Sequence, residues 1–400
     1  MNRRMILGAA AAALSLGAWS PAFAQEPIRI GVLEDMSGVY ADITGAGSVA
    51  GAELAIEDFG GTVLGRPIEL VTADHQNKAD VGASIARKWF DVDGVEMITG
   101  LGNSSVALAV RGIASEKGKV DISTSAGTNA LTGANCSKTG FHWVYNTYAL
   151  SKTIAKSVVE AGADSMYIVA ADYTFGQALA DDARKFTEEA GGKVLGQVNA
   201  PLSTADYSSF ILQAQSSGAK TIGLAIAGGD LVNFIKQASE FGVTEQGQAM
   251  AGFIIFVNDI KALGLNAAKG LYLAETFYWD QDDETRAMAK RYEAKTGEMP
   301  NGMQAGVYGS VLHYLKAVEA AGTTDGEAVA AKMKEMPVED FYTKGAKIRE
   351  DGRVMRDFSL YQVKAPGDSS GDWDMLTRIG TLPEGEAFQT LAEGGCPLVQ

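Results

Sequence analysis

The chain has 400 residues, of which 46% are hydrophobic and 21% are charged, and this composition supports two or three domains with buried cores. Acidic residues outnumber basic ones by 49 to 34, so the surface would repel a polyanion and we expect no nucleic-acid partner. The 47 glycines against 9 prolines favour many tight turns between regular elements, as α/β folds require.

The first segment, 1–24, has the pattern of a signal peptide. Two arginines precede an apolar stretch over 5–17, and the segment ends in Ala22-Phe23-Ala24, the small-x-small pattern that a signal peptidase recognises. A membrane anchor is the alternative, but the apolar stretch is short for a membrane span. We therefore assign 1–24 to a cleaved signal peptide and expect an exported mature chain.

Strands and helices alternate through the next part of the chain. Short apolar runs predict buried strands, and apolar residues at helical spacing predict helices. The predicted order is strand 28–33, helix 43–59, strand 68–73, helix 79–90, strand 96–99, helix 104–117 and strand 120–123. This rhythm predicts a parallel sheet with helices on both faces.

The same rhythm returns after residue 145. Helices are predicted over 149–161, 174–190, 206–217 and 230–241, and strands over 166–170, 193–199, 221–226 and 249–253. Beyond a strand-like run at 270–277 come helix-like stretches at 282–297, 303–321 and 325–336 and strand-like segments near 345–350 and 357–363. This tail has no repeat of its own, so we expect it to complete two tandem α/β units.

The chain contains two cysteines, Cys136 and Cys396. Export would deliver them to an oxidising compartment, where two thiols tend to form a disulfide, so we predict that they are paired. Two unpaired buried cysteines are the alternative. Neither cysteine belongs to a Cys-x-x-Cys pair and the three histidines are scattered, so we expect no metal site.

The sequence lacks the usual motifs of catalysis. Run 45–51 resembles a dinucleotide-binding loop, but its last glycine comes one position late and lies in a helix-like segment, so we interpret it as helix packing. Run 123–127 lacks the leading glycine of a nucleophile elbow. Adjacent carboxylates such as Glu34 and Asp35 are interpreted as solvated surface groups. We therefore predict no enzyme, no catalytic residue and no cofactor.

Two loops of the first unit carry groups that suit a carboxylate. Strand 96–99 is followed by Gly-Leu-Gly-Asn-Ser-Ser at 100–105, and strand 120–123 is followed by Thr-Ser-Ala-Gly-Thr-Asn at 124–129. In a parallel sheet, such loops lie at the carboxyl ends of strands, beside helix N-termini with free N–H groups. Helix capping by the same residues is the alternative interpretation.

Several segments match one known family in order and spacing. They are Ile-Gly-Val-Leu-Glu-Asp-Met-Ser-Gly at 30–38, Gly-Ala-Glu-Leu-Ala at 51–55, Gly-Asn-Ser-Ser at 102–105, the run 122–132, Asp-Tyr-Thr-Phe-Gly at 172–176 and Ala-Ser-Glu-Phe-Gly at 238–242. Through them the chain from Pro27 onward resembles the substrate-binding proteins of ABC importers in the branched-chain amino acid (leucine/isoleucine/valine-binding) group, which have the type I periplasmic binding fold.

The resemblance implies an α/β fold of two doubly wound parallel-sheet lobes, joined by a three-strand hinge, that enclose a small-molecule ligand. It also implies a periplasmic location and a membrane permease as partner, and we expect a monomer. The crossings would lie near Asn146, Phe277 and Arg353. Lobe one would then comprise 27–146 plus 278–352, and lobe two 147–277 plus 353–400.

The resemblance further implies a set of ligand-binding residues. Serines and backbone N–H groups of the two loops would hold a ligand carboxylate, and aromatic side chains would line the cleft. The candidates are Tyr40, Asn103, Ser104, Ser105, Ser125, Ala126, Gly127, Tyr148, Tyr173, Phe175, Asp230, Phe253 and Phe277.

One position departs from the family. Amino-acid binders of this group place a glutamate after the strand assigned to 249–253, where it receives the ligand ammonium, but here Ile-Ile-Phe follows. A buried ammonium without an anionic partner carries a large desolvation cost. We therefore expect a small organic acid, preferably an aromatic carboxylate. Asp230 or Glu275 could replace the glutamate, which leaves a branched-chain amino acid or amide as an alternative. A sensing module for a membrane signalling protein is the alternative to a transport receptor.

Overall fold

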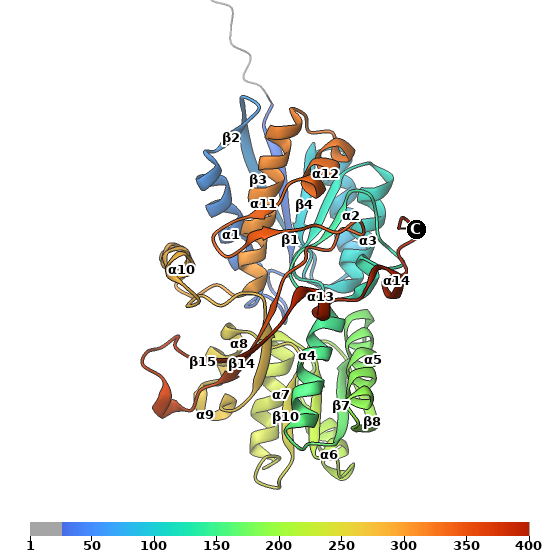
Figure 1. The fold of residues 1–400 in the computed structure, drawn as a ribbon, viewed down its shortest axis with the longest axis vertical. Coiled ribbons are helices and arrows are strands. Elements are labelled where there is room, and N and C mark those ends of the chain that lie inside the picture. The colour runs from blue at the N-terminus through green and yellow to red at the C-terminus, as the bar shows by residue number, and fades with distance from the viewer. Residues whose placement is uncertain (1–25, 400) are drawn as a thin grey trace, which may run out of the picture.

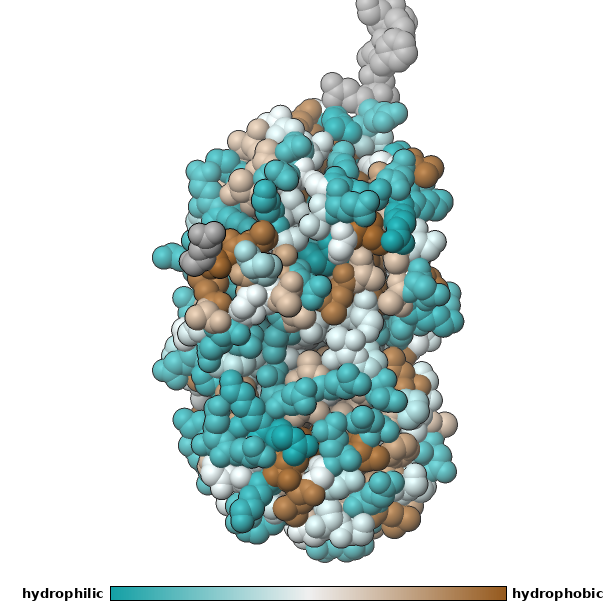
Figure 2. Space-filling model, turned by 90° about the vertical axis from the view of Figure 1, so that its right-hand side faces the viewer, coloured by the Kyte–Doolittle hydropathy of each residue, from teal (hydrophilic) through white to brown (hydrophobic). Residues whose placement is uncertain are grey.

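The computed structural model describes residues 26–399, which form two lobes stacked along the long axis of the molecule (Figure 1). The predicted signal peptide 1–24 lies outside the described residues. Within 26–399, no helix combines the length and the apolar character that a membrane span needs. Figure 2 shows hydrophilic residues over much of one face of both lobes, with apolar residues scattered among them.

The first sheet has six strands in the order β2-β3-β1-β4-β5-β6. Apart from β2, which pairs antiparallel with β3, neighbouring strands run parallel. The strands are β1 (Ile28–Glu34), β2 (Thr62–Val63), β3 (Arg66–Asp74), β4 (Val95–Gly100), β5 (Val120–Ser123) and β6 (Gly140–His142).

Helices cover both faces of this sheet. Ile30 and Val32 of β1 pack with α1 (Gly45–Phe59) and α11 (Gly302–Ala321) on one face. Leu33 packs with α2 (Ala79–Asp91) and α3 (Ser104–Glu116) on the other face. Burial on both faces explains why β1, the strand between β3 and β4, reads as a nearly continuous apolar run.

The second sheet has four parallel strands in the order β10-β9-β7-β8. These strands are β7 (Ser165–Ala171), β8 (Lys193–Ala200), β9 (Thr221–Ala225) and β10 (Ala249–Gly252). The helices of this part are α4 (Thr147–Glu160), α5 (Thr174–Glu189), α6 (Ser208–Ser216), α7 (Gly228–Glu240), α8 (Val257–Leu263) and α9 (Leu265–Ala268). The predicted elements of the second unit are present within a few residues of their expected bounds, and α8 and α9 are additional.

The tail contains a feature that the sequence did not predict, a three-stranded antiparallel sheet. It consists of β11 (Tyr272–Glu275), β14 (Phe358–Val363) and β15 (Leu376–Leu382) in the order β11-β14-β15. The other elements of the tail are α10 (Asp283–Thr296), α12 (Gly326–Glu335), β12 (Val338–Glu339) and β13 (Lys344–Ala346). Strand β15 escaped prediction because it is an edge strand with mostly exposed residues and no apolar run.

The first and third connections between the lobes lie side by side. The N–H of His142, at the end of β6, donates to the carbonyl of Gly352 at 3.0 Å, and the N–H of Val354 donates to the carbonyl of His142 at 3.1 Å. The guanidinium of Arg353 is fully buried and donates to the carbonyl of Tyr145 at 3.1 Å. A single hydrogen-bonded unit therefore ties the two crossings together.

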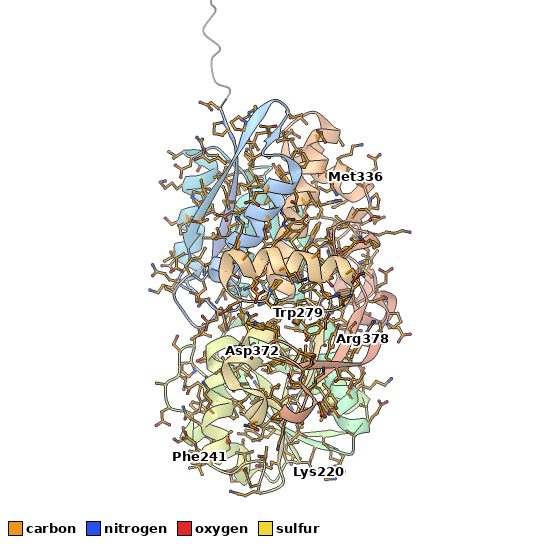
Figure 3. The ribbon with its side chains drawn as sticks, turned by 90° about the vertical axis from the view of Figure 1, so that its left-hand side faces the viewer. Lys220, Phe241, Trp279, Met336, Asp372 and Arg378 are labelled. Atoms are coloured by element: carbon orange, nitrogen blue, oxygen red, sulfur yellow. A yellow bond between two sulfur atoms is a disulfide. The ribbon has the colours of Figure 1, made fainter. Side chains whose placement is uncertain are left out.

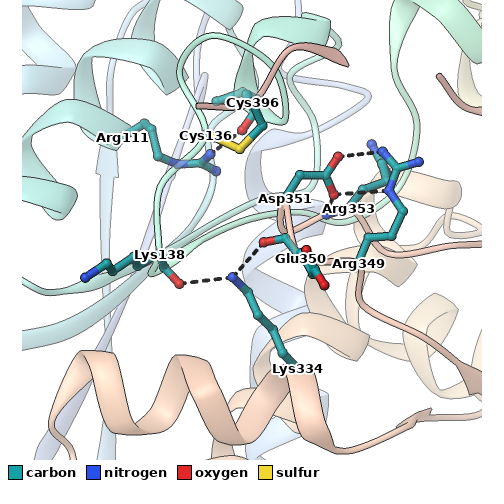
Figure 4. The surroundings of a disulfide bond; sticks show 10 residues. Arg111, Cys136, Lys138, Lys334, Arg349, Glu350, Asp351, Arg353 and Cys396 are labelled. Atoms are coloured by element: carbon teal, nitrogen blue, oxygen red, sulfur yellow. Dashed lines mark hydrogen bonds and ion pairs between the residues drawn. A yellow bond between two sulfur atoms is a disulfide. The ribbon is translucent and has the colours of Figure 1, made fainter. Parts of the chain in front are cut away.

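The predicted disulfide between Cys136 and Cys396 is confirmed, with 5.7 Å between the two Cα atoms (Figure 4). It makes the C-terminal segment a further connection between the lobes. The segment leaves β15, forms α13 (Glu384–Ala387) against α4, where Lys152 donates to the carbonyl of Glu386 at 2.6 Å, and ends after α14 (Leu391–Gly394) at the disulfide (Figure 1). Cys396, which we assigned to lobe two, is thus bonded to lobe one, and the lobe boundaries otherwise stay a prediction.

The loop before β15 packs where the lobes meet. Trp279, which Figure 3 labels in this region, donates its indole N–H to the carbonyl of Trp373 at 3.1 Å. The hydroxyl of Tyr278 donates to the same carbonyl, also at 3.1 Å. The three-stranded antiparallel sheet and its loop therefore support the hinge region, and none of their residues lines the cavity between the lobes.

Candidate ligand-binding site

A cavity lies between the two lobes, at the carboxyl ends of both parallel sheets. Its walls come from the loops after β1, β4, β5 and β6 on one side and after β7, β9 and β10 on the other. Its lining residues are Tyr40, Ile43, Thr44, Gly102, Ser104, Ser125, Ala126, Gly127, Tyr145, Tyr173, Phe175, Ala227, Ile254 and Met303. Three of them belong to the first turns of helices, Ser104 of α3, Phe175 of α5 and Met303 of α11. In this closed arrangement the cavity is small, about 20 Å³, and the space between the walls reaches about 280 Å³ only when the opening to solvent is included.

Helix N-termini from both lobes converge on this cavity. Thr44 precedes α1, Tyr173 precedes α5 and Ala227 precedes α7, while Ser104 is the first residue of α3. The first turn of a helix has N–H groups without intrahelical partners and carries the positive end of the helix dipole. The electrostatics of the cavity therefore favour an anionic group.

The residue before α3, Asn103, has a structural role. Its side-chain oxygen accepts the N–H groups of Ser105 at 2.9 Å and Val106 at 3.2 Å, which is the geometry of an N-cap. Asn103 does not line the cavity. The capping alternative therefore holds for Asn103, while the neighbouring Ser104 reaches the cavity wall.

The carboxyl group of Glu34, at the end of β1, lies directly behind the cavity wall. The hydroxyl oxygens of Ser48 and Ser125 each lie 3.0 Å from Glu34 Oε1, and the N–H of Gly102 donates to Oε2 at 2.7 Å. A Cβ atom at Gly102 would lie 2.6 Å from Oε2, and one at Gly100 would lie 2.8 Å from the carboxyl carbon. Glycine is therefore required at both positions to leave room for this carboxyl group.

Burial sets the protonation of Glu34. The residue is fully buried, and this burial raises its pKa to about 8, although hydrogen bonds to Ser125, Ser48 and Gly102 oppose the rise. Asp35 is fully buried as well and accepts the N–H groups of Gly38 at 2.7 Å and Tyr40 at 2.9 Å. The interpretation of Glu34 and Asp35 as solvated surface groups was therefore wrong.

Hydrogen bonds between the lobes close the cavity. The hydroxyls of Tyr40 and Tyr173 lie 3.0 Å apart, and those of Ser105 and Thr174 also lie 3.0 Å apart. In addition, the N–H of Gly229 donates to the carbonyl of Val39 at 2.8 Å. Each pair joins one lobe to the other, so the structure has the closed arrangement of a hinged two-lobe protein.

The tyrosines of the cavity keep their protons at neutral pH. Burial raises the pKa of Tyr40, Tyr145 and Tyr173 above the usual value of 10.0. The Tyr145 hydroxyl donates to the carbonyl of Ser125, which fixes the loop that carries this serine. All three phenols are therefore neutral, and the hydrogen of Tyr145 is already donated to Ser125.

Seven of the predicted ligand-binding residues line the cavity. They are Tyr40, Ser104, Ser125, Ala126, Gly127, Tyr173 and Phe175. Their contact with a ligand stays a prediction.

The other six predicted residues do not line the cavity; they are Asn103, Ser105, Tyr148, Asp230, Phe253 and Phe277. Ser105 instead forms the contact with Thr174 between the lobes. Tyr148 stacks edge-on against Phe186, with ring centres 4.8 Å apart.

The other three predicted residues outside the cavity have structural roles. Phe253 is fully buried in the larger core, and Phe277 stacks against the ring of Tyr342 at 5.2 Å. The Asp230 carboxylate accepts the N–H of Ser203 at 3.0 Å. These aromatic residues belong to the core, where sequence reasoning could not tell one buried face from another.

Sequence reasoning missed seven lining residues, which are Ile43, Thr44, Gly102, Tyr145, Ala227, Ile254 and Met303. Thr44 and Ala227 precede helices, so the position of the helix start could have identified them. Met303 gave no local signal, because α11 reaches the site only through the tertiary fold.

No acidic side chain lines the cavity among the residues that the structure describes. Glu275, a candidate to replace the missing glutamate, is buried elsewhere and bonds to the backbone N–H of Gly302. Asp230 is held by the backbone near Ser203. Over 26–399, no group of three or more His, Cys, Asp or Glu residues is placed to hold a metal ion.

Comparison with known proteins identifies the class. The family model described as periplasmic binding protein matches residues 27–371, and the chain belongs to this family. A periplasmic binding protein from Burkholderia mallei has 46% identity and a TM-score of 0.92, over 94% of this chain and 100% of that chain. The predicted α/β fold of the type I periplasmic binding proteins is confirmed.

Two further relatives carry more specific names. A branched chain amino acid ABC transporter periplasmic ligand-binding protein from Burkholderia xenovorans has 40% identity and a TM-score of 0.81, over 93% of this chain and 99% of that chain. A Leu/Ile/Val-binding protein homolog from Brucella abortus is 26% identical over 84% of this chain and 89% of its own length. The protein is a periplasmic solute-binding protein of the ABC-transporter type.

Proposed function

We propose that this protein captures a small organic acid, preferably an aromatic carboxylate, between its lobes and delivers it to the permease of an ABC importer. The observation that carries the proposal is the composition of the cavity wall. The wall combines hydroxyls, loop backbone and helix N-termini with aromatic and aliphatic side chains, and no acidic side chain is among the described lining residues.

The polar groups of the wall suit a carboxylate. Ser104 and Ser125 contribute hydroxyls, and Gly127 allows a close approach of the backbone to the ligand. Each charge-assisted hydrogen bond to a ligand carboxylate is stronger than a neutral one in a buried site. The convergent helix N-termini add a favourable field for a negative group.

The apolar walls suit a flat or aliphatic body. Tyr173 and Phe175 of lobe two lie with ring centres 6.0 Å apart, and Tyr40 of lobe one meets Tyr173 across the cleft. A Cβ atom at Gly127 would lie 3.1 Å from the Phe175 ring, so the two lobes are already in close contact there. Aromatic faces and edges contribute contact energy beyond the area they bury.

Delivery follows from closure. A ligand that contacts both lobes binds the closed form better than an open form and shifts the population toward it. The hydroxyl pairs Tyr40–Tyr173 and Ser105–Thr174 form only when the lobes meet. The closed surface is then what a permease would recognise.

A branched-chain amino acid is the second candidate, and the names of the relatives favour it. A zwitterion needs an anionic partner for its ammonium group, and neither Asp230 nor Glu275 lines the cavity. Binding of leucine would require one of these carboxylates to move or the ammonium to rely on neutral acceptors. The geometry therefore favours the organic acid.

The test is a thermal-shift panel on the mature protein with benzoate, 4-hydroxybenzoate, isovalerate, leucine and valine, and with methyl benzoate as the uncharged control. A ligand at a hundred times its Kd stabilises the folded state by about 2.7 kcal/mol, which corresponds to roughly 3 °C for a chain of 400 residues. We expect this shift with at least one acid and none with methyl benzoate. A shift with leucine or valine and with none of the acids would contradict the proposed ligand class.

A further inference from the structure

The buried carboxyl group of Glu34 shares its partners with the cavity. Ser125 and Gly102 both line the cavity, and both also contact this carboxyl group from behind. Ser48 contacts the same Oε1 atom at the same distance of 3.0 Å as Ser125 does, but Ser48 does not line the cavity. Glu34 therefore contacts one serine that lines the cavity and one that does not. A variant of the second serine can serve as the control for a variant of the first.

The hydroxyl of Ser125 has one hydrogen, and its oxygen lies 3.0 Å from Glu34 Oε1 and 3.1 Å from the Thr124 hydroxyl. Thr124 can donate or accept, so the protonation of Glu34 decides whether Ser125 must donate to it. An ionised carboxylate can only accept, so an ionised Glu34 would draw the Ser125 hydrogen toward Oε1 and away from the cavity. The ligand carboxylate, which also only accepts, would then face the lone pairs of Ser125. A protonated Glu34 instead donates its O–H to Ser125 Oγ and frees the Ser125 hydrogen for the ligand.

The surroundings of Glu34 favour the protonated form. The next residue in the chain, Asp35, carries a charge that opposes ionisation of Glu34 and raises its pKa. From α1 and the loops after β4 and β5 it meets only the hydroxyls of Ser48 and Ser125 and the N–H of Gly102.

The neighbouring end of β3 adds no positive charge. The backbone N–H of His75, which follows β3, donates to the backbone carbonyl of Glu34 at 3.0 Å. Burial lowers the pKa of the His75 ring to about 4, so the ring is neutral at pH 7. Among the described residues, no lysine or arginine forms an ion pair or hydrogen bond with the Glu34 carboxyl group.

We propose that Glu34 is a positioning residue that binds as a neutral acid: its O–H donates to Ser125 Oγ and so turns the Ser125 hydroxyl toward the carboxylate of the ligand. The inference rests on the proposed function, because it requires a carboxylate ligand. It adds that the ligand site selects its anion with the help of a protein carboxyl group that keeps its own proton. When Glu34 is ionised, ligand binding must take up one proton from solvent.

The binding test uses isothermal titration with benzoate between pH 6 and pH 9. Benzoate stays ionised over this range, and the buried tyrosines stay neutral because their pKa values are raised. For the wild type we expect a constant Kd up to about pH 7.5 and about a tenfold weaker Kd at pH 9, since the pKa of Glu34 is about 8. A Kd that stays flat to pH 9 would overturn the proposal.

The variant Glu34→Gln imitates the protonated form permanently. Its amide oxygen can accept the Gly102 N–H, and its NH₂ group can donate to Ser125 and Ser48. We expect the pH dependence to disappear, so that Glu34→Gln binds benzoate about tenfold more tightly than the wild type at pH 9. Asp259, whose pKa burial raises to about 7, keeps titrating in both proteins and is thereby separated from Glu34. Equal pH dependence in both proteins would assign it to another group and refute the role of Glu34.

The matched pair Ser125→Ala and Ser48→Ala separates positioning from simple support of the fold. Both variants remove a hydroxyl from the same Oε1 atom, but only Ser125 faces the cavity. We expect Ser125→Ala to weaken benzoate binding about tenfold and Ser48→Ala to change it less than twofold. Equal losses in both variants would show that Glu34 only supports the fold.

A measurement without ligand distinguishes failure of this inference from failure of the proposed function. Infrared spectra of the wild type at pH 7 should contain the C=O stretch of a protonated carboxylic acid that is reduced in Glu34→Gln. If no acid of the panel binds, the proposed function fails, while this band still reports the neutral carboxyl group. If acids bind but the spectra of the two proteins match in this region, Glu34 is ionised and the positioning role is wrong.

Discussion

Removal of the disulfide should destabilise the protein by an amount that follows from the length of the loop it closes. The bond joins Cys136 to Cys396, which are 260 residues apart in sequence. We consider the double variant Cys136→Ser/Cys396→Ser, in which two small polar side chains replace the bond. The folded contacts of the C-terminal segment, such as Arg349 to the carbonyl of Gln389 at 2.6 Å, remain available.

The expected magnitude comes from the entropy of the unfolded chain. Without the bond, the unfolded chain gains the freedom of an open loop, which for 260 residues corresponds to about 5.5 kcal/mol at 25 °C in the loop-entropy model. With an unfolding entropy of about 2.1 cal/mol/K per residue, a chain of 400 residues would lose roughly 6 °C in Tm. Strain or residual structure in the unfolded state lowers this value, so it is an upper bound.

Differential scanning calorimetry of the wild type and the double variant, each with and without reductant, measures this effect. We expect reductant to bring the wild type to the Tm of the double variant and to leave the variant unchanged. The ligand-free proteins are compared, because a bound ligand would add its own stabilisation. A Tm of the double variant within about 1 °C of the wild type would refute the reasoning from loop closure.

Two further predictions concern buried charged and titratable groups. Arg111→Met should lower the free energy of unfolding by about 3–5 kcal/mol in urea denaturation. In the wild type, Arg111 Nε lies 2.6 Å from the carboxylate of the fully buried Asp121, and the variant leaves this carboxylate without its partner. A loss below about 1 kcal/mol would contradict this prediction. His75→Asn should reduce the loss of stability between pH 6.5 and pH 4 by up to about 1.4 kcal/mol per pH unit. Burial lowers the pKa of His75 to about 4 in the folded protein, so the unfolded state takes up the proton first as the pH falls; identical slopes for variant and wild type would contradict it.

The parallel sheets could be predicted from the sequence because most of their strands, such as β1, β4, β5 and β9, are buried on both faces. The run that begins at Ile28 is apolar almost throughout, and a short apolar run followed by a helical pattern has few other interpretations. Strand β15 could not be predicted, since only its first residue is buried and its run has no apolar pattern. It is a strand because it pairs with β14, and this pairing is set by the tertiary fold. Local pattern thus predicted even the edge strands β8 and β10 of the second sheet, which alternate with helices, and failed for β15, which has no apolar run.

Some residues of the site could likewise be predicted from the sequence, and others could not. Ser104 and Ser125 follow strands of a parallel sheet, so topology alone brings them to one edge. Tyr145 and Met303 reach the cavity from the first crossing and from α11, and their positions depend on how the lobes are joined. Glu34 was misinterpreted because a charged residue next to another is usually solvated, whereas glycines at 100 and 102 make room for it here.

The position of Glu34 places two demands on the same groups. Glu34 is buried without a cation, so it must keep its proton. The ligand carboxylate, in contrast, is bound as an anion and must have lost its proton. Ser125, between the two, can satisfy both only by accepting from Glu34 and donating to the ligand. Ionisation of Glu34 should therefore weaken binding because Ser125 then lies between two groups that only accept, whereas methylation of the ligand carboxylate should weaken it because the ester has lost the negative charge, although its carbonyl can still accept from Ser125.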